Sequence, residues 1–167
     1  RKSQEVGDVL SASGKDFIIF ETVGVGQNEH DIVKAADICI VVLVPESGDE
    51  IQMMKAGIIE IADLFVINKS DRPGANRLSS ILKNILHYFS KNDRHEPKVL
   101  NMVATENQSA DNLYSEILLI MNRMMNSQEI NEKRSYRYRQ RVLDITRANL
   151  EKLFWTNKRL DLLKNSS

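Results

Sequence analysis

Three predicted strands, at residues 16–20, 38–44 and 63–67, constrain the fold of this chain most strongly, because each contains a continuous apolar run. Continuous runs, in contrast to alternating ones, are typical of strands that are covered on both faces in a parallel sheet. A fourth, more mixed run at 98–103 is also expected to form a strand. We therefore predict an α/β fold with a doubly wound, mostly parallel sheet and a C-terminal long-helix extension. Helical patterns predict the accompanying helices at about 2–12, 28–36, 50–60, 75–90 and 110–126.

The polar motif Asn68-Lys69-Ser70-Asp71 follows the apolar run that ends at Ile67. Ligands of doubly wound sheets bind at the carboxyl ends of the strands. A carboxylate at Asp71 can accept hydrogen bonds from the N1–H and the exocyclic amine of guanine, whereas adenine would leave it desolvated and unpaired. The Asn68 amide can reach the acceptor edge of the base and tie neighbouring loops together, while the Lys69 stem lies over the ring. The spacing therefore predicts a guanine-specificity motif.

A second motif, ETVGVGQ at residues 21–27, follows the first apolar run. Here a carboxylate, Glu21, stands three positions before a glycine, Gly24. Phosphate-binding α/β proteins use this spacing to place an acid near Mg²⁺ and to bring the backbone N–H of the glycine close to a terminal phosphate. Gln27 can orient an attacking water, although an ordinary turn residue is the alternative interpretation. Both motifs fall at the carboxyl ends of predicted strands, where phosphate and base must be held together.

The stretch from Glu21 to Asp71 resembles the GTPase chaperones of methylmalonyl-CoA mutase, which are also described as lysine/arginine/ornithine transport ATPases. These proteins are P-loop GTPases, and the close match covers about a third of this chain. Three signatures carry the resemblance: the ETVGVGQ loop, N-K-x-D, and a G-D-x-x-Q-x-x-K-x-G segment. The residues of this last segment are Gly48, Asp49, Gln52, Lys55 and Gly57.

The resemblance implies a GTP-binding and GTP-hydrolysing chaperone of adenosylcobalamin-dependent methylmalonyl-CoA mutase, with GTP or GDP and Mg²⁺ as cofactors. The ETVGVGQ loop would be switch II, with Glu21, Gly24 and Gln27 in catalysis and Glu21 at the metal, directly or through water. The backbone of Ala104 would contact guanine, with an ordinary strand-to-helix loop as the alternative. A further loop, switch III, would relay the nucleotide state to the mutase through Gly48, Asp49, Gln52 and Lys55.

The chain opens on Arg1 and contains no G-x-x-x-x-G-K-[ST] motif, the loop that cradles the β- and γ-phosphates. The family would place that loop upstream, so we expect residues 1–127 to be the C-terminal part of a GTPase domain. This stretch alone is then expected to be inactive. Three alternatives stay open: a P-loop-free paralogue, a non-catalytic module that dimerises and docks a mutase, and part of a fused GTPase–mutase.

Residues 128–167 are predicted to form a helical dimerisation or docking arm, with one long helix over 128–164. Its apolar residues keep a seven-residue spacing that is typical of a helix packed along a partner. The resemblance also implies dimerisation through C-terminal helices, and folding back onto an upstream segment is the alternative. The stripe consists of Leu143, Leu150, Leu153 and Leu160, with Thr146 and Asn157 at polar seam positions.

The composition and charge of the chain limit which kinds of partner and which cellular compartments we expect. The 23 basic and 23 acidic residues give a formal net charge of zero, so no global field favours nucleic acid or an anionic membrane, and we expect neither as a partner. No apolar stretch approaches the roughly 18 residues that cross a bilayer. The three histidines show no metal-ligand spacing. We expect a cytoplasmic protein, or one of the mitochondrial matrix if the parent is eukaryotic.

Overall fold

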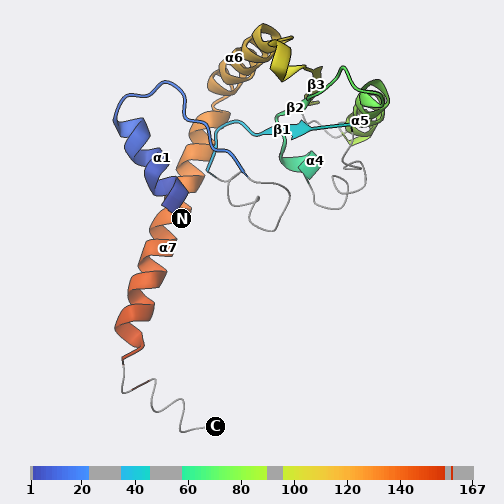
Figure 1. Cartoon of the computed structure of the whole chain (residues 1–167). Helices are drawn as coiled ribbons and strands as arrows, with labels where there is room; N and C mark the ends of the chain where they lie inside the picture. Colours follow the sequence, from blue (N-terminus) through green and yellow to red (C-terminus); the bar gives the residue numbers. More distant parts are fainter. Residues whose placement is uncertain (1, 23–34, 46–57, 90–95, 157–158, 160–167) are drawn as a thin grey trace, which may run out of the picture. The chain divides into compact units, whose positions relative to one another are not determined.

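The computed structural model describes residues 2–22, 35–45, 58–89, 96–156 and 159, and its elements form an α/β fold, as predicted (Figure 1). The chain divides into two compact units, residues 1–126 and 127–167. The described elements are, in order, α1 (Lys2–Ala12), β1 (Ile40–Leu43), α4 (Ile58–Ile61), β2 (Leu64–Ile67), α5 (Ala75–Phe89), β3 (Lys98–Asn101), the 3₁₀ turn η1 (Ala104–Glu106), α6 (Ala110–Asn126) and α7 (Glu129–Phe154).

The three described strands form a parallel sheet in the order β1-β2-β3. The register places Val66 of β2 between Val42 of β1 and Leu100 of β3. Parallel neighbours need a long crossover connection, and α5 supplies the one between β2 and β3. The parallel sheet predicted from the continuous apolar runs is therefore confirmed for these three strands.

The core of the first unit lies between β2 and α5. All four residues of β2 are buried, and Phe65 and Ile67 are completely inaccessible. Helix α5 faces them with Leu78, Leu82 and Leu86, which recur every four residues and so share one face of the helix. This packing fixes the carboxyl end of β2, from which the Asn68 motif projects.

An ion pair joins the start of β3 to α6. The Lys98 Nζ lies 2.7 Å from Glu116 Oε2, and the Glu116 side chain is only 11% exposed. On the same helix Ile120 and Met124 are buried. A carboxylate removed from water in this way needs its charged partner, so the pair stabilises the placement of α6 against the strand.

The prediction of a strand at 16–20 was wrong, because residues 17–20 are not paired in any described ladder. A strand needs a hydrogen-bonding neighbour, and no described strand lies beside this segment. Ile19 is accordingly 92% exposed. Val42 is 60% exposed, since β1 is the edge of the described sheet and is not covered on both faces.

Other boundaries differ less. The mixed strand ends at Asn101 and not at residue 103, whereas α1 and α6 begin and end where the sequence predicted. Most of the predicted helices at 28–36 and 50–60 lies outside the described residues, and α4 is the described end of the second. The long C-terminal helix ends at Phe154, ten residues before the predicted 164. There the Phe154 carbonyl accepts a 2.7 Å hydrogen bond from Arg159 Nη1, which satisfies a terminal acceptor.

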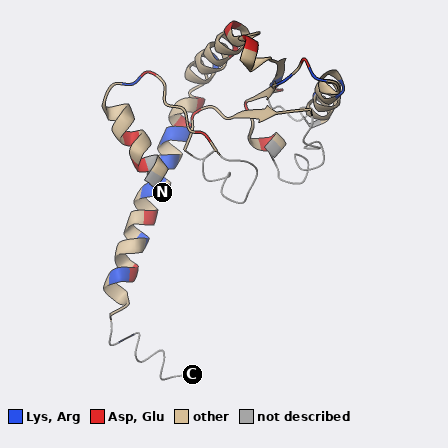
Figure 2. Ribbon diagram, viewed as in Figure 1, with Lys and Arg blue, Asp and Glu red and all other residues tan. Residues whose placement is uncertain are grey.

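Helix α7 exposes most of its surface, and Ile130 is the buried residue found along it. Both basic and acidic side chains lie along its length, and the basic ones are more numerous (Figure 2). Leu143, Leu150 and Leu153 are all more than half exposed. The Thr146 hydroxyl donates to the Val142 carbonyl at 2.8 Å, so it is satisfied within its own helix. The other two predicted stripe positions, at 157 and 160, lie outside the described residues.

Candidate functional site: the loops after β2 and β3

The loops after β2 and β3 begin at the same edge of the sheet, because the two strands are parallel neighbours. Backbone pairing continues one residue beyond the strands. The Asn68 N–H donates to the Leu43 carbonyl at 2.8 Å, and the Met102 N–H donates to the Ile67 carbonyl at 2.9 Å. The motif after β2 and the loop after β3 are therefore neighbours at the carboxyl ends of their strands. This is the edge at which parallel α/β sheets bind ligands.

The Asn68 side chain joins the two loops. Its Oδ1 accepts hydrogen bonds from the Lys69 N–H at 2.8 Å and from the Ala104 N–H at 3.1 Å, 36 residues away in sequence. A backbone hydrogen bond of 3.1 Å from the Ser70 N–H to the Met102 carbonyl adds a second link. The structure thus brings together the sequence-predicted residues Asn68, Lys69 and Ala104.

The motif turns sharply at Lys69, whose φ of 56° lies in the left-handed region. Such a conformation is uncommon for a residue with a side chain and persists where surrounding contacts impose it. Here the Asn68 side chain holds the Lys69 N–H, and the Arg72 N–H donates to the Lys69 carbonyl at 3.0 Å. Asp71 lies inside this turn and is exposed, so its carboxylate is accessible to a ligand at the sheet edge.

The loop after β3 folds back on itself. Val103 is 4% exposed and pairs with Gln108 in an isolated antiparallel bridge. Between them Asn107 adopts a left-handed φ of 54° and donates its N–H to the Ala104 carbonyl at 3.2 Å. The buried Val103 therefore anchors the loop, while Ala104 stays exposed next to Asn68. The N–H that the resemblance assigned to guanine donates to Asn68 in this structure.

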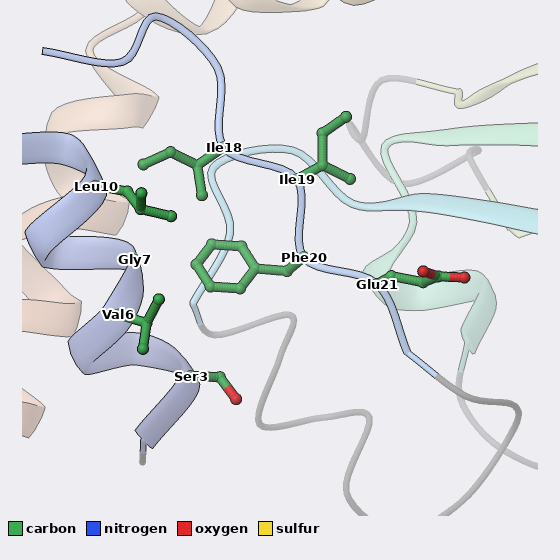
Figure 3. Close-up of a pocket in the computed structure, with 8 residues that line it drawn as sticks. All are labelled: Ser3, Val6, Gly7, Leu10, Ile18, Ile19, Phe20 and Glu21. Carbon is green, nitrogen blue, oxygen red and sulfur yellow. The ribbon is translucent and has the colours of Figure 1, made fainter.

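Glu21 belongs to neither of these loops. It lies at the end of the extended segment that follows α1. It is exposed and lines a cavity of about 380 Å³ between α1 and residues 18–21 (Figure 3). The other predicted catalytic residues, Gly24 and Gln27, lie outside the described residues. So do all four of the switch III residues, Gly48, Asp49, Gln52 and Lys55.

The described residues do not build a magnesium site of their own. No group of three histidine, cysteine or acidic side chains gathers among them in a way that suits a metal ion. Magnesium often binds one or two carboxylates together with water and substrate phosphates. Glu21 is the one candidate carboxylate that the sequence named and the structure describes, so we derive no step through the metal.

Met102 is a residue of this site that sequence reasoning missed. It contributes backbone groups only, since its carbonyl receives the Ser70 N–H and its N–H continues the ladder to Ile67. Any side chain allows those contacts, so no residue-type signal marks the position. The only available signal was topological: the residue that follows a strand beside the Asn68 motif must face that motif.

No described helix is both long and apolar enough to cross a lipid bilayer.

A family model described as "Methylmalonyl Co-A mutase-associated GTPase MeaB" matches residues 1–159. The chain belongs to this family.

Individual relatives carry related names. A protein of Pyrococcus abyssi named as a candidate GTPase is 42% identical over 140 residues, 82% of this chain and 43% of that protein. GTPase ArgK of Escherichia coli is 33% identical over 122 residues, 71% of this chain and 37% of its own length. The mouse "methylmalonic aciduria type A homolog, mitochondrial" is 30% identical over 161 residues, 94% of this chain and 39% of that protein. The chain therefore spans less than half the length of these relatives.

Proposed function

We propose that this chain forms the guanine-binding part of a GTPase that serves as a chaperone of adenosylcobalamin-dependent methylmalonyl-CoA mutase. The observation that carries the proposal is the Asn68 side chain, which accepts the Ala104 N–H at 3.1 Å and so holds two loops at one edge of the sheet. Membership of the MeaB family supports the mutase as the partner. The names of the relatives support GTP as the nucleotide.

Recognition of guanine follows from the chemistry of three side chains. Asp71 is exposed within the turn, and its two oxygens match the two adjacent donors of guanine, N1–H and the exocyclic amine. Asn68 sets the spacing between the loops and Lys69 supplies an aliphatic stem to cover the ring. Adenine would present an acceptor, N1, where Asp71 requires a donor. The preference for guanine therefore arises mainly because a bound adenine would desolvate the Asp71 carboxylate and leave it unpaired.

The phosphate end of the nucleotide is assigned to residues at the other motif. Glu21 is proposed to act at or behind the water shell of Mg²⁺, the Gly24 N–H to contact the γ-phosphate, and Gln27 to orient the attacking water. The switch III residues Gly48, Asp49, Gln52 and Lys55 are proposed to report the nucleotide state to the mutase. A P-loop is required as well, so hydrolysis belongs to the longer polypeptide that joins this chain to a P-loop, here called the extended protein.

Dimerisation and location complete the proposal. The exposed leucines of α7 favour a homodimer that is held by the C-terminal helices. We propose a location in the cytoplasm, since the zero formal net charge gives no global attraction to an anionic membrane surface. The mitochondrial label of the mouse relative supports the mitochondrial matrix for a eukaryotic parent.

The decisive substitution is Asp71→Asn in the extended protein. It replaces one acceptor oxygen with a donor that faces a guanine donor, so GTP affinity is expected to fall by about 2–3 kcal/mol, roughly 30- to 150-fold. Xanthosine triphosphate carries a carbonyl where guanine carries its amine, and the new amide can donate to that carbonyl. The variant is therefore expected to bind xanthosine triphosphate more tightly than GTP, as measured by calorimetric titration.

The matched control is Asp144→Asn on α7, which makes the same chemical change at another exposed aspartate. It should leave the affinities for both nucleotides unchanged. If Asp71→Asn bound GTP as tightly as the parent does, the assignment of the base site would be wrong.

A further inference from the structure

Gly7 is an unexpected residue in the middle of α1. Glycine is among the poorest helix formers, so an interior glycine calls for a packing reason. Gly7 is buried, and a Cβ atom built on it would lie 2.5 Å from Cζ and 3.2 Å from Cε1 of Phe20. Real side chains do not approach this closely. A side chain at position 7 therefore requires the Phe20 ring to move, because the end of that ring occupies the place of a Cβ atom.

The Phe20 ring anchors a segment that lacks strand pairing. Residues 17–20 are extended but belong to no ladder among the described strands. The two aromatic residues of this segment make side-chain contacts: Phe20 meets α1 at Gly7, and the Phe17 ring lies 6.5 Å from that of Tyr114 on α6 at an interplanar angle of 58°. Phe17 and Tyr114 are both more than half exposed, so the contact of Phe20 with Gly7 is the closer packing of the two.

Glu21 directly follows the anchored residue. Successive side chains of an extended chain point in opposite directions. In Figure 3 the Phe20 ring is directed toward Gly7, between Val6 and Leu10, while the Glu21 side chain is directed away from α1. The depth of the ring against Gly7 therefore influences the direction and position of the Glu21 carboxylate.

We infer that Gly7 is a positioning residue for Glu21, acting through the Phe20 ring. The inference rests on the proposed role of Glu21 in GTP hydrolysis. A methyl group at position 7 requires the Phe20 ring to move. Rotation about the Cα–Cβ bond alone would leave Glu21 in place, but Val6 and Leu10 lie on either side of the ring (Figure 3), so we expect the ring to withdraw together with its backbone. That withdrawal moves the segment that carries Glu21. Displacements of about 1 Å at catalytic groups can lower rates by about 100-fold.

Gly7→Ala in the extended protein separates this role from a purely helical one. Alanine is the best helix former, so a merely structural glycine predicts a more stable α1 and an unchanged rate. The positioning role predicts that the rate of GTP hydrolysis falls by about 10- to 100-fold. The affinity for GDP should stay within about twofold, because GDP lacks the γ-phosphate and the base loops are unchanged. Ser11→Ala, at an exposed position of the same helix, is the control and should leave both quantities unchanged.

Combining Gly7→Ala with Phe20→Leu tests the route of the effect. The shorter side chain makes room for the methyl group, so the double variant should regain most of the lost rate. A wild-type rate in Gly7→Ala, or a loss that Phe20→Leu does not recover, would overturn the inference. After either of these two outcomes, the proposed function would still be supported if the extended protein prefers guanine and that preference depends on Asp71.

A crystal structure of the Gly7→Ala variant provides a readout that needs no turnover. The Phe20 ring and the backbone of residues 18–21 should be displaced from α1 in this variant and restored in the double variant. If the wild-type extended protein hydrolyses no GTP, the proposed function fails and this displacement alone decides whether Gly7 fixes the segment. An unmoved segment in Gly7→Ala would then reject the inference.

Discussion

Strand β2 and helix α7 treat their apolar side chains in opposite ways. All four residues of β2 are buried, including Phe65 at 0% exposure. Among the 26 residues of α7, Ile130 is the buried one, and Leu150 and Leu153 are 60% and 74% exposed. The apolar residues of the two regions are of similar types, Leu, Ile, Val and Phe, but their surroundings differ. Apolar residues indicate a core only where another element of the same chain covers them.

The energetic consequence differs accordingly. Each fully buried large apolar side chain of β2 contributes about 1.5–3 kcal/mol relative to an exposed one. The leucines of α7 make no such contribution while they face water, and they gain it when a partner covers them. The sheet unit is therefore expected to depend on its own core, and α7 on association. The following substitutions test that contrast.

The largest effect is expected for Phe65→Ala in β2. Removing a completely buried ring loses its transfer free energy and leaves a cavity, which together cost about 3–5 kcal/mol. Urea unfolding of the extended protein, followed by circular dichroism, should show a lower midpoint at an unchanged slope, and the shift in midpoint multiplied by that slope should equal this loss of free energy.

Phe154→Ala on α7 is the matched control for that change. Phe154 is 54% exposed, with an edge-on contact to Trp155 at a ring distance of 5.0 Å and the Arg159 guanidinium 4.6 Å from its ring centre. Its loss should cost only about 1 kcal/mol in the monomer, because exposed contacts of this kind are weak. Equal costs at the two positions would break the comparison.

A change of assembly, in place of a change in the stability of the sheet unit, is expected from Leu150→Asp combined with Leu153→Asp. Each substitution places a charge in the proposed seam and removes about 1.5–3 kcal/mol of apolar burial from it. Light scattering at tens of micromolar should report a dimer for the wild type and a monomer for this variant.

Gln140→Asp combined with Asn149→Asp is the control, since both residues are exposed and polar on the same helix. It adds the same charge outside the leucine stripe and should leave the dimer intact. A wild-type monomer would reject the dimer. A dimer that survives both leucine substitutions would place the interface outside the described part of α7.

The sequence was most informative where local patterns and burial agree. The apolar runs around Val42 and Phe65 form β1 and β2, and the amphipathic pattern around Leu82 forms α5. The position of the Asn68 motif after a buried strand also followed directly from the order of residues. These features depend on the periodicity of neighbouring residues, which a single sequence contains.

Features that depend on distant partners were not predictable in the same way. Residues 16–20 have the composition of a strand, but pairing requires a neighbour that no local pattern specifies. The link from Asn68 to Ala104 spans 36 residues, although a role for Asn68 in joining loops was expected. At the early end of α7 the Arg159 side chain donates to the Phe154 carbonyl, a contact that has no sequence signature.

The central claim is that the two loops at the edge of β2 and β3 hold a guanine base. A crystal structure of the extended protein with GDP tests it most directly. The account predicts that the Asp71 carboxylate accepts hydrogen bonds of about 2.7–3.2 Å from both N1 and the exocyclic amine, with the Lys69 stem over the ring. A base bound elsewhere, or one whose donors face water in place of Asp71, would contradict it.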